Sequence, residues 1–328
     1  MSELIDALPG IELPVSQVTQ QLAAMWAVGP AGSPNESRAS QMNVVLHFGL
    51  EVSVEQACSR FETVVQFSRR YPCRIIVLCP KHEAGDGSMQ AKLFSQCYIG
   101  ESLREMCCSE ALLLSYKSED YGHLSNQVSV WLESDLPTYH WFSAVPTQRV
   151  QSYFDNLLVG VRRVVYDSSI EQEDLAAMPW PDASRVKDLA KARLLPVRQV
   201  VGQYLSAYSI DELCLGLQSV QVTYCGEMSG EGRGILSWVR ECLNVCEQSA
   251  GVSSATVRYE LSLCEDAASD DSLRLEFTYS DQRYFVWRKF KQGSLGEIKA
   301  YLGKGHDKIS TRVKPLSPEQ ALSEALLF

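Results

Sequence analysis

The fold is decided by the stretch RRYPCRIIVLCP, residues 69–80. Basic residues end a helix, Pro72 prevents that helix from continuing, and an apolar strand begins at Ile75. This junction places Cys73 and Arg74 at the entry edge of a sheet, where side chains can face a ligand or another subunit. Because Cys73 lies beside a positive charge that favours thiolate, it is the best candidate for a responsive thiol.

Strands and helices alternate on both sides of this junction. Hydrophobic periodicity predicts strands at 41–48, 75–78, 89–99, 111–116, 138–142 and 163–166, with helices at 15–27, 53–70, from 124 to about 132, and 148–161. Such alternation is typical of a mainly parallel sheet that is covered by helices. We therefore expect an α/β domain over residues 1–180.

A proline-marked connector, Met178–Asp182, leads into a second domain over residues 181–328. This domain is expected to be α+β, starting with a helical connector at 184–195 and 196–207. A strand at 217–224 and a helix at 234–248 follow. Antiparallel strands are predicted at 255–264, 272–280 and 284–289, and a terminal helix at 317–327.

Composition limits the classes of partner. The 328 residues are 45% hydrophobic and 21% charged, which is typical of a folded globular protein. The net charge of −10 argues against nucleic acid or an anionic membrane as a partner, since either requires a basic surface. The first residues lack the basic and apolar regions of a signal peptide, so we expect a cytoplasmic protein.

Eleven cysteines are many for a cytoplasmic chain, but they form no C-x-x-C pair, which argues against structural zinc. Most are expected to be small buried hydrophobic residues. Cys242 and Cys246 lie one helical turn apart, so they are either core residues or a redox pair. Cys107 and Cys108 are neighbours in a strand and point to opposite faces of the sheet.

The sequence carries no local signature of a catalytic site, a metal site or a cofactor site. No phosphate-binding loop, dinucleotide fingerprint or nucleophile elbow is present, and the five histidines are scattered. One glycine-rich stretch, Gly226–Gly234, lies between a strand and a helix. Its amides at Gly232 and Gly234 could cradle an anion beside Arg233, although a flexible loop is the simpler interpretation.

Four segments, in the same order, resemble the glucose-6-phosphate dehydrogenase assembly protein family, OpcA. They are the basic-Pro-Cys-Arg turn and strand (70–78), the Cys-Cys strand entry (107–110), the Asp-Leu-Pro turn with its tryptophan strand (132–141), and the strand that ends in Asp-Ser (164–168). Two features differ from the family pattern: His140 stands where that family has the first of two tryptophans, and Ser109 separates the cysteine pair from Glu110. The sequence is thus similar to a divergent member.

The resemblance implies a non-catalytic protein without a cofactor that promotes assembly or activation of glucose-6-phosphate dehydrogenase in the oxidative pentose phosphate pathway. That enzyme would be its protein partner, and self-association is left open. Exposed aromatic and arginine side chains usually anchor interfaces, so the candidate partner-binding residues are Arg74, Trp131, Tyr139 and Trp141. All three aromatic residues could equally belong to the core, and for Trp141 the core is the better interpretation.

The resemblance also suggests a redox role for thiols, and the candidates are Cys73, Cys107, Cys108, Cys242 and Cys246. The alternative function is a sugar-phosphate-binding α/β enzyme or sensor. In that case Arg74, Arg233 or Lys304 would bind the phosphate.

Overall fold

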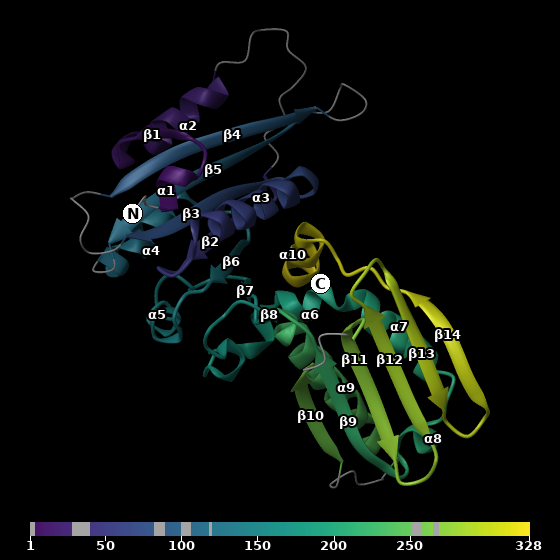
Figure 1. The fold of residues 1–328 in the computed structure, drawn as a ribbon. Coiled ribbons are helices and arrows are strands. Elements are labelled where there is room, and N and C mark those ends of the chain that lie inside the picture. The colour runs from purple at the N-terminus through teal and green to yellow at the C-terminus, as the bar shows by residue number, and fades with distance from the viewer. Residues whose placement is uncertain are drawn as a thin grey trace. The chain divides into compact units, whose positions relative to one another are not determined.

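The computed structural model divides the chain into two compact units (Figure 1). The first comprises Met1–Asp188 and Pro318–Phe328, and the second comprises Leu189–Ser317. The structure describes residues 4–27, 40–81, 89–99, 106–117, 120–250, 257–264 and 269–328.

The first unit is built on an eight-stranded sheet with the strand order β1-β4-β5-β3-β2-β6-β7-β8. The six strands from β5 to β8 in this order run parallel, and β4 and β1 add antiparallel strands at one edge. The predicted mainly parallel sheet is confirmed. The strands are β1 (Ile11–Leu13), β2 (Met42–Phe48), β3 (Cys73–Lys81), β4 (Gln90–Ile99), β5 (Met106–Lys117), β6 (Thr138–Ser143), β7 (Arg163–Tyr166) and β8 (Val186–Asp188).

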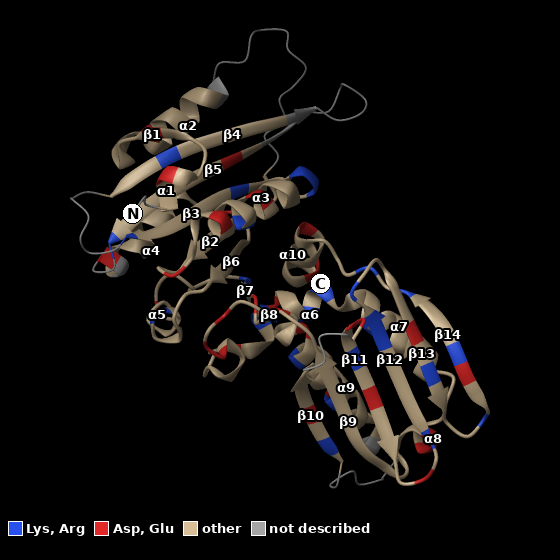
Figure 2. Cartoon of the chain, viewed as in Figure 1, with Lys and Arg blue, Asp and Glu red and all other residues tan. Residues whose placement is uncertain are grey.

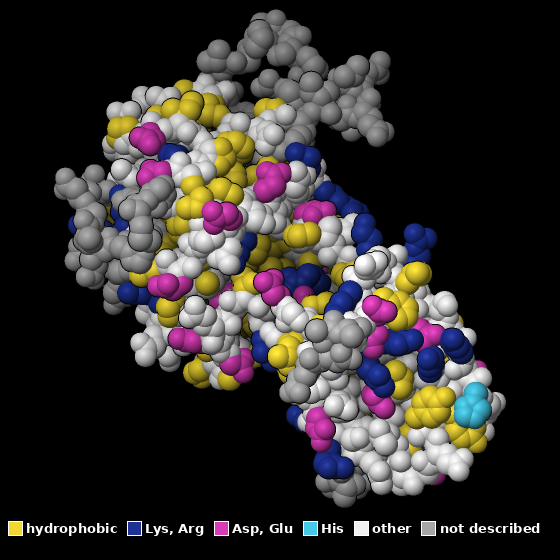
Figure 3. Space-filling view, in the orientation of Figure 1, with side chains coloured by type: hydrophobic (Ala, Val, Ile, Leu, Met, Phe, Trp, Pro, Cys, Tyr) yellow, Lys and Arg dark blue, Asp and Glu magenta, His cyan; other side chains and the backbone are white. Residues whose placement is uncertain are grey.

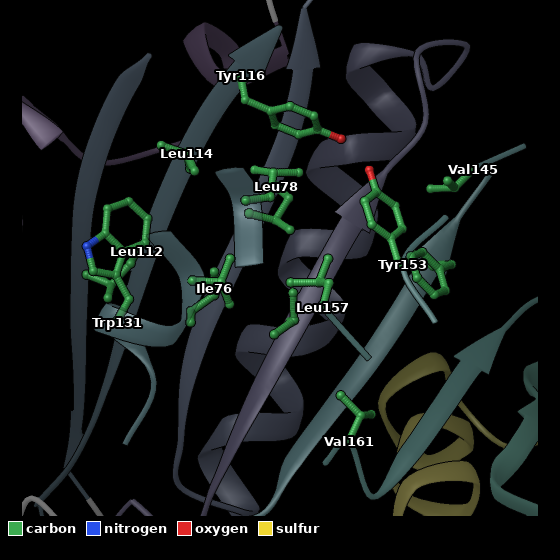
Figure 4. Packing of buried hydrophobic residues seen from close by; sticks show 14 of the residues in the cluster. Ile76, Leu78, Leu112, Leu114, Tyr116, Trp131, Val145, Tyr153, Leu157 and Val161 are labelled. Carbon is green, nitrogen blue, oxygen red and sulfur yellow. The ribbon is translucent and has the colours of Figure 1, made fainter. Parts of the chain in front are cut away.

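Helices cover both faces of this sheet. The longest, α3, starts with a capping box in which Ser53 accepts from the Gln56 amide and the Gln56 side chain accepts from the Ser53 amide. α3 packs against α1 and α10, whereas α2 and α4 contribute to the core cluster shown in Figure 4. The helices are α1 (Leu4–Ala7), α2 (Val18–Ala27), α3 (Val54–Arg70), α4 (Tyr121–Trp131), α5 (Thr147–Gln151) and α10 (Pro318–Leu327), with 3-10 turns at Val15–Gln17, Leu175–Ala177 and Ala183–Arg185.

The central strands explain why the sequence folds in this way. Every residue of β2 is buried, as are eight of the nine in β3. An apolar run of this kind fits only a strand with both faces covered, and each large apolar side chain that is buried contributes about 1.5–3 kcal/mol.

The second unit is a six-stranded sheet with the order β10-β9-β11-β12-β13-β14. Its core combines one sheet face with residues of α7 and α9. The helices are α6 (Leu189–Arg193), α7 (Leu195–Leu205), α8 (Ile210–Cys214) and α9 (Ser229–Ala250); the strands are β9 (Leu217–Tyr224), β10 (Arg258–Leu263), β11 (Asp271–Tyr279), β12 (Tyr284–Phe290), β13 (Leu295–Tyr301) and β14 (His306–Arg312).

Charged residues of both signs lie along β11 to β14 (Figure 2). Arg274 pairs with Glu276 at 2.7 Å, and Arg288 pairs with Glu297 at 2.7 Å. In the space-filling view, Lys, Arg, Asp and Glu side chains are interspersed on this face of the unit (Figure 3). Interspersed charges of this kind are typical of a sheet face that is in contact with water.

Four sequence-based predictions of secondary structure are wrong in detail. Residues 148–161 form only the short helix α5 followed by turns, because hydrogen bonds such as Phe154 N–H to Gln151 O replace the helical ladder. The predicted helix at 184–195 contains strand β8. β10 is parallel to β9, since α9 forms the crossover between them. The strands β13 and β14 were not predicted, because solvent-facing charges and a glycine obscure their alternation.

The carboxyl end of β2 holds the tightest backbone contact that positions the site. β3 pairs with one edge of β2 and β6 with the other, so the strand order reverses there. The amide of Gly49 donates to Ser143 O at 2.8 Å. A Cβ atom on Gly49 would lie 1.7 Å from the carbonyl oxygen of Ala144, which itself has a φ of 55°. Only glycine fits at position 49.

We expect Gly49→Ala to lower the free energy of unfolding by at least about 3 kcal/mol, because backbone atoms must move to admit the methyl group. Urea denaturation followed by circular dichroism measures this. Gly122→Ala is the matched control: a Cβ atom there meets nothing within 4 Å, and the residue lies in α4. It should raise stability by up to about 1 kcal/mol. Equal stabilities for the two variants would contradict the close approach.

Candidate functional site

A row of polar residues crosses the amino end of the parallel sheet. Glu110 on β5 is in register with Arg74 on β3, Arg74 with Asn43 on β2, and Asn43 with Thr138 on β6. Buried polar groups at neighbouring positions must satisfy one another, since water does not reach them. The row therefore joins four strands at one level.

Arg74 is the centre of this row and is only 5% exposed. Its Nε atom lies 2.6 Å from Glu110 Oε1, and its Nη2 atom lies 2.5 Å from Glu133 Oε1. Its Nη1 atom donates to the carbonyl oxygen of Trp131 at 2.9 Å. Asn43 continues the network, accepting from the Glu133 amide at 3.0 Å and donating to the Glu133 carbonyl at 2.9 Å. All these bonds are internal.

The structure places the four predicted partner-binding residues in the interior. Trp131 is 1% exposed, and Tyr139 and Trp141 are each 4% exposed. Of the two places that sequence analysis left open for the three aromatic side chains, an interface or the core, the structure has the core, because α4 and β6 direct them inward. In this unit, neither the three aromatic side chains nor Arg74 is exposed enough to anchor a partner.

Two histidines and two tyrosines form a buried cluster near the carboxyl end of the same sheet. His47 Nε2 lies 2.7 Å from the Tyr116 hydroxyl, and His47 Nδ1 lies 3.3 Å from His140 Nε2. The hydroxyl groups of Tyr116 and Tyr153 point toward each other (Figure 4). Both histidine side chains are fully buried.

Both rings of the histidine pair are neutral. Burial lowers the pKa of His47 from 6.5 to about 3, and the positive charge of Arg149 adds to the effect. Burial, and then the neighbouring His47, hold the pKa of His140 well below its usual value. A single proton shared between His47 Nδ1 and His140 Nε2 makes one hydrogen bond between the rings. The other nitrogen of His140, Nδ1, has no hydrogen-bond partner. This pair is thus a structural group and not a proton donor near neutral pH.

Above this cluster lies a cavity of about 430 Å³. Its walls come from the residues that follow β2 and β6, from the end of β3, from Tyr116 on β5 and from α5. A crevice outside the carboxyl ends of parallel strands, at the point where the strand order reverses, is where open α/β sheets bind ligands. Sequence analysis did not identify this site, because its residues lie on four separate stretches of the chain.

A partly buried carboxyl group, Glu171, lies beside the same reversal point. Its Oε1 atom accepts from the Ala144 amide at 3.1 Å, and Arg60, which donates to Ser143 Oγ, attracts it electrostatically. Burial outweighs both effects and raises the pKa of Glu171 to about 7.

The candidate redox cysteines are dispersed. Cys73 is buried at the start of β3, and the side chains of Cys107 and Cys108 lie outside the described part of the structure. Partial burial, then Cys246 and Glu241, raise the pKa of Cys242 on α9, which disfavours the reactive thiolate.

Three further cysteines have specific environments that sequence analysis did not single out. Cys97 on β4 is disulfide-bonded. Cys225 and Cys264 follow β9 and β10, which are neighbouring parallel strands. Burial and a hydrogen bond with Cys264 raise the pKa of Cys225 to about 11.

The prediction that Gly232, Arg233 and Gly234 lie in a loop is wrong. These residues lie inside α9, where the Gly232 amide already donates to Met228 O at 2.9 Å. These glycines allow close packing: a Cβ on Gly232 would lie 3.0 Å from Leu261. Lys304 pairs with Glu212 at 3.0 Å. Arg74, the third of these alternative phosphate ligands, lies in the other unit, where it pairs with Glu110 and Glu133.

Among the described residues, no three His, Cys, Asp or Glu side chains are grouped so that they could hold a metal ion. None of the described helices is long and apolar enough to cross a membrane.

Comparison with known proteins finds a family match within the first unit. Residues 64–179 match the sequence model of the family described as the glucose-6-phosphate dehydrogenase subunit N-terminal domain, OpcA. Over these residues, roughly a third of the chain, the sequence is similar to the OpcA family. The resemblance carried by the four sequence segments is confirmed, and all four lie within the matched range. Three of those segments supply Arg74, Glu110 and Glu133, so the OpcA-like motifs meet at one buried guanidinium.

Two curated relatives match part of the chain. A "Putative OxPP cycle protein OpcA" from Synechocystis is 29% identical over 140 residues, which are 40% of this chain and 29% of that protein. One of the same name from Synechococcus elongatus is 32% identical over 99 residues, which are 30% of this chain and 22% of that protein. The match thus spans less than a third of either relative.

Solved structures with a similar arrangement are distant. An aldose-aldose oxidoreductase from Caulobacter crescentus has a TM-score of 0.43 and 8% identity, over 87% of this chain and 88% of that one. The transcriptional regulator Gal80p from Kluyveromyces lactis has a TM-score of 0.43 and 7% identity, over 88% and 82%. At these values the likeness indicates nothing about reaction or ligand.

We expect Arg74→Met to lower the free energy of unfolding by about 3–5 kcal/mol, because it leaves the buried Glu110 carboxylate without its partner. The double variant Arg74→Met/Glu110→Leu should be more stable than the single variant, since it removes the stranded charge as well. Urea denaturation of both, with the exposed Arg162→Met as control, measures this. A double variant less stable than the single one would contradict the ion-pair network.

The buried histidines and Glu171 should change the pH dependence of stability in opposite directions. His140 has a lowered folded pKa, so the unfolded chain alone binds its proton and stability falls as the pH drops below 6.5. Glu171 has a raised folded pKa of about 7 against 4.5, so its contribution is fully present below pH 4.5 and is lost as the pH rises through 7.

Between pH 6 and pH 5, His140→Phe should therefore make the loss of stability on acidification shallower by up to about 1.4 kcal/mol per pH unit. Glu171→Gln should make this loss of stability steeper, since the folded chain can then no longer bind the proton that stabilises it at Glu171. Urea denaturation at half-unit pH steps measures both slopes. Changes of the same sign in the two variants would contradict the assignment.

Proposed function

We propose that this protein is a cytoplasmic, non-catalytic factor that promotes assembly or activation of glucose-6-phosphate dehydrogenase in the oxidative pentose phosphate pathway. The observation that carries the proposal is the match over residues 64–179 to a family whose description names that enzyme. The two curated relatives named for the OxPP cycle support the same pathway.

A factor of this kind acts through differential affinity. It shifts an assembly equilibrium only if it binds the assembled dehydrogenase more tightly than the dissociated or inactive form. A hundredfold difference in affinity is worth about 2.7 kcal/mol, which is enough to move an enzyme from mostly inactive to mostly active. By linkage, assembly of the dehydrogenase must raise its affinity for this protein by the same factor.

Within this proposal, the partner surface lies away from the four residues that sequence analysis selected. Arg74, Trp131, Tyr139 and Trp141 are taken up by the interior of the first unit. The family-like segments therefore support the domain that presents the surface, and a partner would contact side chains on its outside or on the second unit.

The test is a dilution series of the dehydrogenase from the same source, with and without the purified full-length chain. We expect dehydrogenase activity to persist in the presence of the chain at dilutions where the enzyme alone loses it, and a larger particle to appear by light scattering. The chain alone should oxidise no glucose 6-phosphate. Serum albumin at equal concentration is the control for non-specific protection. Unchanged activity together with an unchanged particle mass would overturn the proposal.

A further inference from the structure

The cavity at the carboxyl end of the first sheet has the size and position of a small-molecule site. Its volume of about 430 Å³ falls within the range of roughly 300–1,000 Å³ that is usual for ligand pockets. Gly49 and Leu50 follow β2, and Val145 and Pro146 follow β6, so the two loops at the reversal point form its walls. Backbone packing at Gly49 fixes those loops.

The lining combines apolar walls with one charge. Leu50, Pro80 and Val145 contribute apolar surface, and Arg149 on α5 is the only charged residue among the described residues that line the cavity. A guanidinium group presents a planar fork of donors that matches a carboxylate or a phosphate. The charge of this wall therefore selects for an anion.

The floor of the cavity is held in place before any ligand arrives. Tyr116 lines the cavity and is bonded to the buried His47 at 2.7 Å. His47 is in turn bonded to His140, and both rings are enclosed by the core. A preformed wall lowers the entropic cost of binding, since its side chains lose little freedom when a ligand enters.

We propose that this cavity binds a small organic anion, whose phosphate or carboxylate group pairs with Arg149 and whose body packs against Leu50, Pro80 and Val145. The proposal concerns a site that the family match does not assign, and it does not depend on the proposed role with the dehydrogenase.

Isothermal titration calorimetry of the full-length chain with two matched sets of probes tests it. One set is glucose 6-phosphate, gluconate and glucose; the other is phenyl phosphate, benzoate and benzyl alcohol. We expect at least one anionic probe to bind and the neutral member of its set to bind at least about tenfold more weakly, because a charge-assisted pair is lost. Comparing the two sets shows whether the cavity prefers a sugar or an apolar ligand body. Comparing the two anions within a set shows whether it prefers phosphate or carboxylate.

Arg149→Gln should weaken binding of that anionic probe by at least about tenfold, and Arg149→Lys should weaken it less, because the charge is kept and only the fork is lost. Leu50→Trp should abolish binding by filling the cavity, which provides a test that leaves Arg149 in place. Arg162→Gln, an exposed arginine outside the lining, is the control and should leave binding unchanged. Circular dichroism checks that each variant is folded.

Three results would overturn the proposal. They are no binding of any anionic probe at millimolar concentration, equal binding of the neutral and anionic members, or unchanged binding in a folded Arg149→Gln variant. Because none of these measurements involves the dehydrogenase, they can fail while the assembly role holds, and the reverse is equally true.

Discussion

The buried guanidinium of Arg74 is the interaction on which the first unit depends. Removing such a group from water costs several kcal/mol, and the cost is offset only when its donors are all directed at acceptors. Here Glu110, Glu133 and the carbonyl of Trp131 provide those acceptors from β5, from the turn after α4 and from the end of α4 itself. A shift of β3 by one residue would turn Arg74 to the other face and remove it from the buried Glu110 carboxylate, so the ion pair selects one register.

That register has consequences at the opposite end of the sheet. β2 is paired with β3 and β6 over its whole length, so fixing the level of Asn43 also fixes the level of His47. His47 must then meet Tyr116 and His140 at bonding distance, and Gly49 must pass against the backbone of Ala144. The geometry of the cavity is therefore set by polar contacts at the amino end together with a backbone contact at the carboxyl end.

Much of this fold can be predicted from sequence because its local signals agree. The apolar runs of β2 and β3, the capping box of α3 and the proline after it all indicate the same parallel arrangement. What sequence could not predict is pairing at a distance. The partners of Arg74 lie 36 and 59 positions further along the chain, and nothing local shows that a guanidinium at a strand entry points inward. The candidate cavity was missed for the same reason, since its charged residue stands in a short helix after a different strand.

The burial of Arg74 also changes how the family-like motifs should be interpreted. Residues shared with a family of assembly proteins suggest an interface, yet an interface residue must be able to leave water when the partner arrives. Arg74, Trp131 and Trp141 are already removed from water when the domain folds. Their burial therefore stabilises the domain and does not add to the affinity for a partner. Under the proposed role, a substitution at one of them would weaken binding of the dehydrogenase only by lowering the fraction of folded chains. A substitution on the outside would weaken binding while leaving the stability of the chain unchanged. The two classes of residue can therefore be separated by measuring stability and partner affinity on the same variants.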